Sequence, residues 1–312
     1  MHRHDLYQLI ARNKRGTAAF IAVFAVILAV IGAAVGIYLG WDWWTYALLG
    51  IGIVLYNLVL YRNSDRIALA VNGARPAPRE QFGQLHNVVE EVALAAGIVP
   101  PRVYVIETDT PNAFATGRDQ HHAAIAVTRG LLEAMNREEL QGVVAHEMAH
   151  VRNCDILMMT VVAIIGGLII LLRDVFLRGG LFFGGHRRRE SGGRGGGQAQ
   201  LILVVVGLVL AIVAPLLVAL MRAAISRQRE YLADASGAYI VRNPHGLARA
   251  LEKLARAPGK LATASDATAH MFIASPFARD RGERVGWLAS HPPLSDRVAR
   301  LRSLTFDDRP AG

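Results

Sequence analysis

Four long apolar runs divide this chain, and no other feature constrains its fold as strongly. They lie at about residues 17–39, 45–61, 156–172 and 201–220. A helix that rises 1.5 Å per residue needs roughly 20 residues to cross a hydrocarbon core of about 30 Å, and the runs are close to that length. Hydrophobic residues make up 53% of the chain. Because they are gathered in blocks rather than spread evenly, the sequence predicts a membrane protein.

The first two runs predict a transmembrane hairpin at residues 17–61. Its connecting turn holds three aromatic side chains that suit a membrane interface: Trp41, Trp43 and Trp44. Basic residues flank the hairpin and are absent from the turn: Arg12, Lys14 and Arg15 precede it, and Arg62 and Arg66 follow it. The positive-inside rule therefore places both ends, including a tail at residues 1–16, in the cytoplasm. A cleaved signal peptide is the alternative, but the first run is longer than a usual signal core and a second run follows at once.

The third and fourth runs predict a second hydrophobic hairpin, at residues 156–221. A loop rich in arginine and glycine separates them, at about residues 179–197. If both runs span, the segment between them lies outside and carries arginines against the positive-inside tendency: Arg173, Arg178, Arg187, Arg188, Arg189 and Arg194. Either the hairpin is inserted despite that bias, or its helices are partly buried in protein and do not cross fully. We expect spanning, which gives about four transmembrane helices.

The rest of the chain predicts a soluble domain in two parts, residues 62–155 and 222–312. Apolar residues at helical spacing predict an amphipathic helix that ends at Gly97: Leu85, Val88, Val89 and Val92. Residues 102–106 and 123–128 have strand character, and the turn-rich segment PNAFATGRDQ joins them. The second part is expected to be helical. The predicted fold class is therefore mainly α with a small β-sheet (α+β).

The run HEMAH, at residues 146–150, indicates a metal site. A capping box predicts where its helix begins: Asn136 and Glu139. Residues four apart share one face of a helix, so His146 and His150 can direct imidazole nitrogens at one metal ion, with Glu147 beside it. Zinc suits two imidazoles and one carboxylate and keeps a position for water, which Glu147 can deprotonate for attack on a peptide carbonyl. A chance match on a structural helix is the alternative.

A third ligand is expected from the segment SRQREYLAD, after the fourth apolar run. Glu230 and Asp234 are again four residues apart, so one helical face presents both. Glu230 would complete the shell of one zinc ion per chain. Asp234 would accept a hydrogen bond from the second nitrogen of a ligand histidine and fix its tautomer. Taken alone, the segment could be a solvated helix, but beside HEMAH the ligand role is favoured.

Six features follow one another in a specific order along nearly the whole chain. They are the early hairpin, PNAFATG at 111–117, HEMAHVRNCD at 146–155, the downstream hydrophobic pair, EYLAD at 230–234 and SHPPLSDR at 290–297. In this combination the chain resembles the HtpX-type branch of the M48 family of membrane metallopeptidases. The resemblance implies a zincin-like metallopeptidase domain with Glu147 as general base, and zinc ligands at His146, His150 and Glu230. It also implies an endopeptidase of the inner (plasma) membrane, facing the cytoplasm, that degrades damaged or misfolded membrane proteins in quality control and stress response.

Two of these motifs gain a further interpretation beside the resemblance. His291 and Arg297 could donate hydrogen bonds to the oxyanion formed when water attacks the scissile carbonyl. The alternative is a helix start with Arg297 merely solvated. In PNAFATG we expect an edge strand that holds an extended substrate by main-chain hydrogen bonds, with Asn112 and Ala113 nearest the metal and Phe114 beside them. The alternative is a turn before the second strand.

Three residues directly after HEMAH receive smaller roles. Asn153 and Asp155 match the pattern of the M48 family, and we expect them to end the helix or to support the metal ligands by hydrogen bonds. Cys154, between them, is interpreted as a packed small residue rather than a ligand. It is the one cysteine in the chain, so no intramolecular disulfide can form.

The charge and composition limit the classes of partner that this chain can bind. The net charge is +9, and the excess consists mainly of arginine beside the apolar runs, which favours lipid headgroups over nucleic acid. Expected partners are the lipid bilayer and polypeptide substrates, in particular misfolded membrane proteins. Two rival functions are a catalytically inactive membrane scaffold and a peptidase directed at prenylated C-termini. Intact HExxH, ExxxD and HPP elements argue against the first, and four apolar runs are too few for the membrane chamber of the second.

Overall fold

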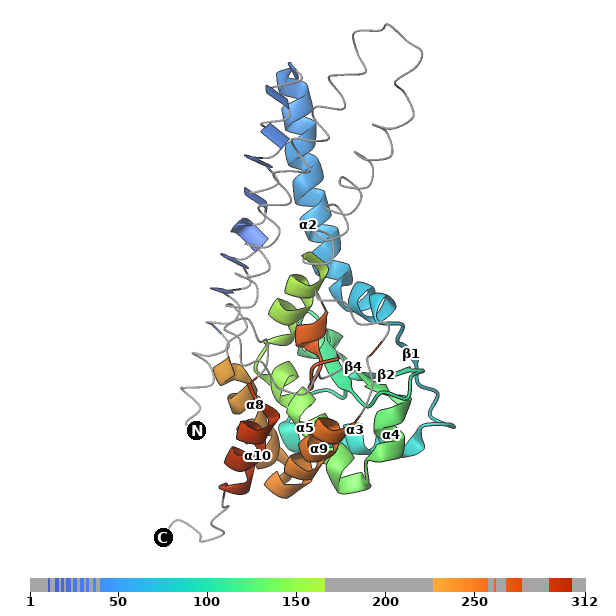
Figure 1. Cartoon of the computed structure of the whole chain (residues 1–312). Coiled ribbons are helices and arrows are strands. Elements are labelled where there is room, and N and C mark those ends of the chain that lie inside the picture. Colours follow the sequence, from blue (N-terminus) through green and yellow to red (C-terminus); the bar gives the residue numbers. More distant parts are fainter. Residues whose placement is uncertain are drawn as a thin grey trace, which may run out of the picture.

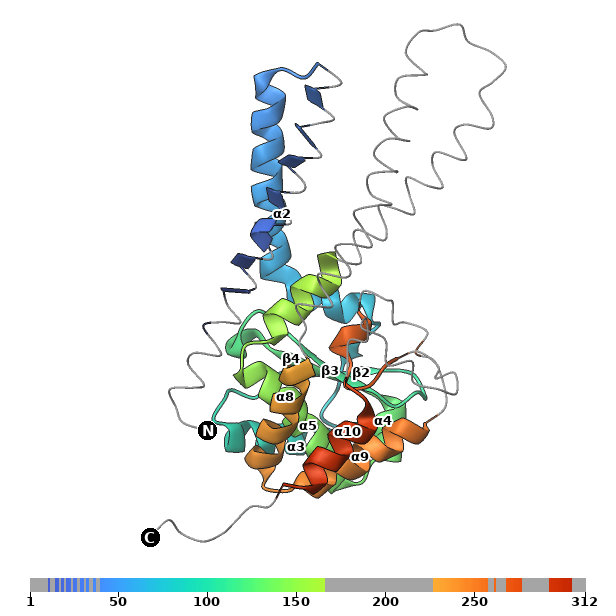
Figure 2. The same cartoon turned by 60° about the vertical axis from the view of Figure 1, so that its left-hand side comes forward.

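The structure, a computed structural model, describes residues 40–165, 227–257, 261, 268–276 and 292–304, with scattered positions between 11 and 37. In Figure 1 one long helix, α2 (Trp43–Val71), rises from a domain in which helices surround a small sheet. Figure 2 shows the same arrangement turned by 60°, with the upper part of α2 standing clear of the domain. The described chain is therefore mainly helical with a small sheet, as the sequence predicts.

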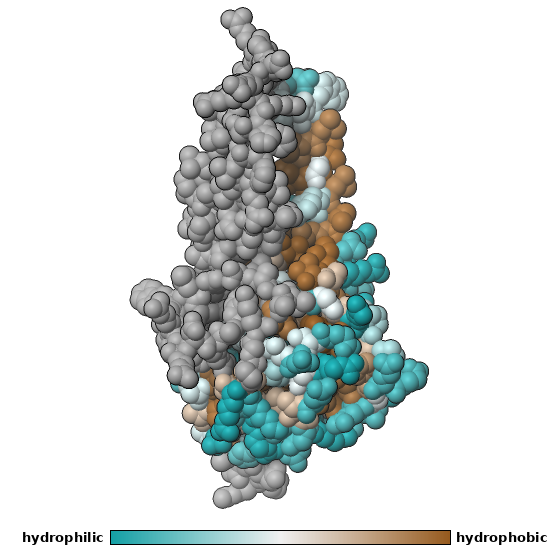
Figure 3. All heavy atoms as spheres, turned by 45° about the vertical axis from the view of Figure 1, so that its right-hand side comes forward, coloured by the Kyte–Doolittle hydropathy of each residue, from teal (hydrophilic) through white to brown (hydrophobic). Residues whose placement is uncertain are grey.

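α2 is the one helix in the described part of the chain that by itself is long and apolar enough to cross a membrane. The N-cap residue Asp42 caps its first turn, because the Asp42 side chain accepts a hydrogen bond from Thr45 N at 3.0 Å. Leu48 and Val54 in its upper half are 68% and 66% exposed. Figure 3 shows this half as a hydrophobic column above a hydrophilic domain. A surface of this kind is what a helix presents to lipid.

The lower end of α2 differs from the prediction. The second apolar run was expected to end near Tyr61, but the helix continues to Val71, and its last turns are buried against the domain. Asp65 forms an ion pair with Arg102 in β2. The charges after Tyr61 end the apolar run without ending the helix, because charged residues are compatible with a helix and Asp65 can be buried once it has a partner. One continuous helix thus joins the apolar column to the sheet.

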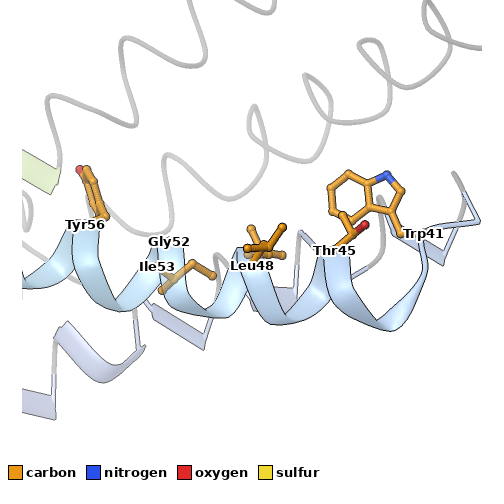
Figure 4. Close-up of a pocket in the computed structure, with 7 residues that line it drawn as sticks. Trp41, Thr45, Leu48, Gly52, Ile53 and Tyr56 are labelled. Atoms are coloured by element: carbon orange, nitrogen blue, oxygen red, sulfur yellow. The ribbon is translucent and has the colours of Figure 1, made fainter.

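A shallow apolar groove of about 470 Å³ runs along the upper half of α2. Figure 4 shows its labelled side chains spaced along one side of the helix, with Trp41 and Tyr56 at the two ends. Its lining residues are Trp41, Thr45, Leu48, Leu49, Gly52, Ile53 and Tyr56. None of them belongs to the predicted active site.

The sheet has four strands in the order β1-β2-β4-β3. They are β1 (Arg75–Pro76), β2 (Arg102–Ile106), β3 (Ala113–Thr116) and β4 (Ala124–Thr128). β2 and β4 are parallel, and β1 and β3 pair antiparallel at the two sides, so the sheet is mixed. β2 and β4 confirm the two strands expected from sequence. β3 lies inside the segment PNAFATGRDQ, which therefore contributes an edge strand and not simply a turn. The short helices η1 (Gln120–His122) and α4 (Arg129–Ala134) flank β4 in the chain.

α5 (Arg137–Arg152) runs through the centre of the domain and carries HEMAH. Its predicted capping box is confirmed, since Asn136 accepts from Glu139 N at 2.9 Å and Glu139 accepts from Asn136 N at 2.9 Å. The amphipathic helix that was expected to end at Gly97 is α3 (Gly83–Ala96), and Gly97 takes the left-handed conformation that ends it. α3, α8 (Arg227–Val241) and α9 (Pro244–Arg256) pack around α5. η2 (Ala269–Met271) and α10 (Leu294–Arg302) complete the described elements.

The chain turns sharply after α5. The residues Ile156–Ile165 are helical and make an angle of 87° with α5. At the turn, Cys154 has a positive φ of 57°. The rest of the predicted second hairpin, with its fourth apolar run and its arginine-rich and glycine-rich loop, lies outside the described residues.

Candidate active site

α5 places three predicted site residues in the interior of the domain. His146, Glu147 and His150 are 1%, 2% and 3% exposed. The Nε2 atoms of His146 and His150 lie 3.2 Å apart, with their ring planes at 88°. The i, i+4 spacing therefore turns both imidazoles toward one point, as a helix requires.

α8 brings Glu230 to the same point. Its Oε2 atom lies 3.8 Å from His146 Nε2, and its Oε1 atom lies 3.6 Å from His150 Nε2. Zn–N and Zn–O bonds of about 2.0–2.1 Å at tetrahedral angles separate neighbouring ligand atoms by about 3.3 Å. The three observed separations lie near that value, and two imidazoles with one carboxylate form a donor set that zinc accepts. These residues fit a metal ion.

A glycine on α8 allows this approach. Gly237 is seven residues after Glu230 and therefore lies on the same face of the helix. A Cβ atom at Gly237 would lie 2.9 Å from His146 N and 3.0 Å from Ala145 O, closer than packed atoms allow. The missing side chain lets α8 contact the backbone of α5 beside the first histidine of the motif.

Two carboxylates hold the outer nitrogens of the histidines. Asp234 Oδ1 lies 2.9 Å from His146 Nδ1, and Asp155 Oδ2 lies 3.0 Å from His150 Nδ1. A proton on each Nδ1 donates to its carboxylate and leaves each Nε2 lone pair to face the other histidine and Glu230. This is the arrangement in which carboxylates fix the tautomer of metal-binding histidines.

The protonation tendencies of the two histidines differ. Burial lowers the pKa of His146, and Arg297 lowers it further against the opposing effect of Asp234. Burial also acts to lower the pKa of His150, but Asp155 and Glu230 outweigh it and raise the pKa to about 9. The carboxylates of Asp155 and Glu230 thus place negative charge beside His150, where the three ligand atoms meet.

Arg297, on α10, is buried beside this cluster with no exposed surface. Its Nε and Nη2 atoms donate to the carboxylate of Asp234 at 2.8 and 2.7 Å, and Nη1 donates to the carbonyl of Ile273 at 2.8 Å. Nη1 also lies 3.4 Å from Glu230 Oε2. Burial alone would raise the pKa of Asp234, but Arg297 lowers it below its usual value. The alternative that Arg297 is merely solvated is therefore wrong.

Glu147 points into the same interior. Burial raises its pKa to about 7, while a hydrogen bond from the backbone of Ala115 lowers it. Its Oε1 atom is buried and has no hydrogen-bond partner among the described residues. A buried carboxylate oxygen without a partner is costly, so its position indicates a place for a hydrogen-bonding ligand.

The remaining predicted site residues are distributed as follows. Ala113 and Phe114 lie in β3, Asn112 directly precedes it, and all three are buried. Asn153 is the buried C-cap residue of α5. His291 lies outside the described residues.

Two contributors to the site were not predicted from the sequence. Gly237 had a signal, since it continues the spacing of Glu230 and Asp234 along one helical face. Ala115 had none, because it acts through its backbone, and only the fold brings that backbone to Glu147.

Comparison with known sequences decides the family. The profile of Peptidase family M48 matches residues 79–305. The chain belongs to peptidase family M48. It is 54% identical to the Protease HtpX homolog of Thermoanaerobacter pseudethanolicus, over 98% of this chain and 100% of that protein. It is 55% identical to the Protease HtpX homolog of Caldanaerobacter subterraneus subsp. tengcongensis, with the same coverage. This M48 peptidase is therefore HtpX-like, and its cluster of two histidines and a glutamate fits the metal site of a metalloprotease.

Among solved structures, the crystal structure of S. mikatae Ste24p aligns with a TM-score of 0.46 at 17% identity. The alignment covers 95% of this chain and 67% of that one. At this level the likeness does not establish a shared fold.

Proposed function

We propose that this M48 peptidase is an integral membrane zinc endopeptidase with one ion per chain, held by His146, His150 and Glu230. The observation that carries the proposal is the convergence of these three ligand atoms beside the buried oxygen of Glu147, which has no hydrogen-bond partner among the described residues. When bound, zinc would polarise the scissile carbonyl and make a water molecule more acidic.

Glu147 is suited to move the proton. A group with a pKa of about 7 can accept a proton from water at neutral pH and release it to the departing amine. Glu147 lies one residue from His146, so an ion bound by the histidines would also change its pKa. The role assigned to Glu147 therefore rests on its position and its unsatisfied oxygen.

The other polar groups position these atoms. Asp234 and Asp155 fix the orientation of the two histidines, and Arg297 holds Asp234 in place. We retain the predicted oxyanion roles of His291 and Arg297 as part of the proposal. One Nη1 proton of Arg297 already binds Ile273 O, so that proton is not available to the substrate while Ile273 stays in place.

We further propose that the substrates are damaged or misfolded membrane proteins and that the domain faces the cytoplasm. The exposed apolar half of α2 supports membrane insertion, and its continuation into the domain keeps the metal cluster close to the bilayer. The arginines that flank the first predicted hairpin support the cytoplasmic orientation.

The test is cleavage of an unfolded model protein by the full chain purified in detergent with added zinc. The wild-type chain should cleave it, a chelator should stop cleavage, and Glu147→Gln should retain the metal while losing activity by at least about 100-fold. No cleavage by either form with zinc bound would favour the inactive scaffold. Cleavage of prenylated peptides alone would favour the prenyl-directed peptidase.

A further inference from the structure

One edge of the sheet contacts both Glu147 of α5 and an internal peptide segment. In β3, Ala113 and Ala115 are two residues apart and therefore direct main-chain groups to the same edge, opposite β4. The backbone of Ala115 donates a hydrogen bond to Glu147. The carbonyl of Ala113 accepts one from Ile273 N at 3.0 Å. The segment that contains Ile273 is thus paired to β3 directly beside the proposed general base.

This segment, residues 272–274, lies against β3 like an added strand. Phe272 forms an antiparallel bridge with Phe114, and their rings are 5.2 Å apart in an edge-to-face arrangement. Asn112 brackets Ala274, with Nδ2 donating to its carbonyl at 3.0 Å and Oδ1 accepting from its amide at 3.4 Å. The hydrogen bonds with Ala113 and Asn112 involve only the main chain of the segment, so they do not depend on its side chains. Only the aromatic pair does.

Arg297 connects the segment to Asp234, the carboxylate beside His146. Arg297 donates from Nη1 to Ile273 O at 2.8 Å, while its other donors hold Asp234. The segment is therefore bound by the carbonyl of Ala113, the side-chain amide of Asn112 and the buried guanidinium of Arg297. An extended peptide that adds to an edge strand is likewise held through its main chain.

We propose that residues 272–274 occupy the peptide-binding edge of β3 and that an extended, apolar substrate segment must displace them to reach Glu147. This inference rests on the proposed function and adds a built-in inhibitory contact to it. The pocket vacated by Phe272 favours an aromatic substrate side chain against Phe114. Displacement also frees the Arg297 Nη1 proton that Ile273 O accepts, so that it can bind a substrate carbonyl.

The first test weakens the internal pairing. Ile273→Pro removes the amide that donates to Ala113, and Phe272 already has the extended conformation (φ −79°, ψ 145°) that precedes proline without strain. Phe272→Ala removes the ring and keeps the main chain. Each variant, as the zinc-loaded full chain, should cleave an unstructured peptide with a kcat/KM about 10-fold above wild type, because Ile273→Pro loses roughly one hydrogen bond and Phe272→Ala loses the aromatic pair with Phe114.

A matched control is Phe82→Ala, which truncates the same side-chain type at a site packed against Arg129 and away from the β3 edge. It should leave kcat/KM unchanged. Unchanged or reduced kcat/KM in folded, metal-loaded Ile273→Pro and Phe272→Ala would overturn the proposal, because the segment would then build the site rather than block it.

A second test needs neither substitution in the segment nor turnover. In Glu147→Gln, a saturating unstructured peptide with a central phenylalanine should accelerate hydrogen exchange at the Ile273 amide about 10-fold or more, while the amide of Val127 in β4 stays protected. If the peptide binds and Ile273 remains protected, or if no peptide binds, the inference is wrong. The proposed function can survive that result, because it depends on Glu147-dependent cleavage by the wild-type chain.

Discussion

Arg297 holds both carboxylate oxygens of Asp234, at 2.8 and 2.7 Å, and the guanidinium is wholly buried. The same Asp234 oxygen that accepts from Nη2 lies 2.9 Å from His146 Nδ1. An arginine on the last described helix thus orients a proposed metal ligand on α5 through one aspartate. Such a buried ion pair need not add stability as a whole, but loss of one partner leaves the other charge uncompensated.

Arg297→Ala is therefore expected to destabilise the fold by about 3–5 kcal/mol and to lower zinc affinity. Thermal unfolding and zinc titration of the purified chain measure the two effects. Arg300→Ala is the matched control on the same helix, since Arg300 is exposed and stacks on Tyr231. If the two variants have the same unfolding temperature and zinc affinity, Arg297 does not support the metal ligand.

Gly237→Ala is expected to separate α8 from α5. The new Cβ atom would meet His146 N at 2.9 Å, and because this neighbour is backbone, the helix must shift. Glu230 and Asp234 move with it, so zinc affinity should fall at least about 10-fold, as when groups that support metal ligands are displaced. Gly83→Ala, where a Cβ atom meets nothing within 4 Å, should leave zinc binding intact. Isothermal zinc titration distinguishes the two, and a normal affinity for Gly237→Ala would refute the packing argument.

Asp155→Asn tests the second orienting carboxylate. The amide is similar in size but is a weaker acceptor for the Nδ1 proton of His150, so it orients the ring less firmly. Zinc affinity should fall about 10-fold to 100-fold with the fold preserved. Asp119→Asn is the control, because its partner His122 lies on an exposed turn. Competition with a fluorescent zinc chelator gives both affinities, and no difference between the variants would argue that Asp155 only ends the helix.

The ion pair between Asp65 and Arg102 predicts that α2 and the sheet unfold together. Arg102→Ala leaves the Asp65 side chain, which is 9% exposed, without this partner. A loss of about 1–2 kcal/mol is expected, reduced by the partial exposure of Arg102. Arg79→Ala breaks a pair in which both side chains are largely exposed, and it should not change the unfolding temperature. Thermal unfolding in detergent compares them, and equal temperatures would show that the pair does not couple helix and sheet.

The parts of the fold that the sequence predicted depend on local patterns. The capping box at Asn136, the end of α3 at Gly97 and the i, i+4 spacing of His146 and His150 are each set by neighbours within one or two helical turns. β2 was equally clear from its alternation. At these positions the residue types favour the same local conformation that the overall fold requires.

The parts that were uncertain or missed depend on partners distant in sequence. β3 was expected as an edge strand with a turn as the alternative, because Pro111, Asn112 and Gly117 give its segment the composition of a turn, and its strand character comes from pairing with β4. Arg297 could not be placed from its motif, because its partner Asp234 is 63 residues away. The extension of α2 was missed for the same reason, since Asp65 is compensated by Arg102 on another element.

The most direct test of the central claim is the zinc environment in the purified full chain, measured by X-ray absorption at the zinc edge together with metal content. The account predicts one zinc per chain with only nitrogen and oxygen ligands at about 2.0–2.1 Å, two of them imidazoles, and loss of one oxygen ligand in Glu230→Ala. A sulfur ligand at about 2.3 Å would make Cys154 part of the site, and a spectrum unchanged by Glu230→Ala would show that His146 and His150 bind the metal without it.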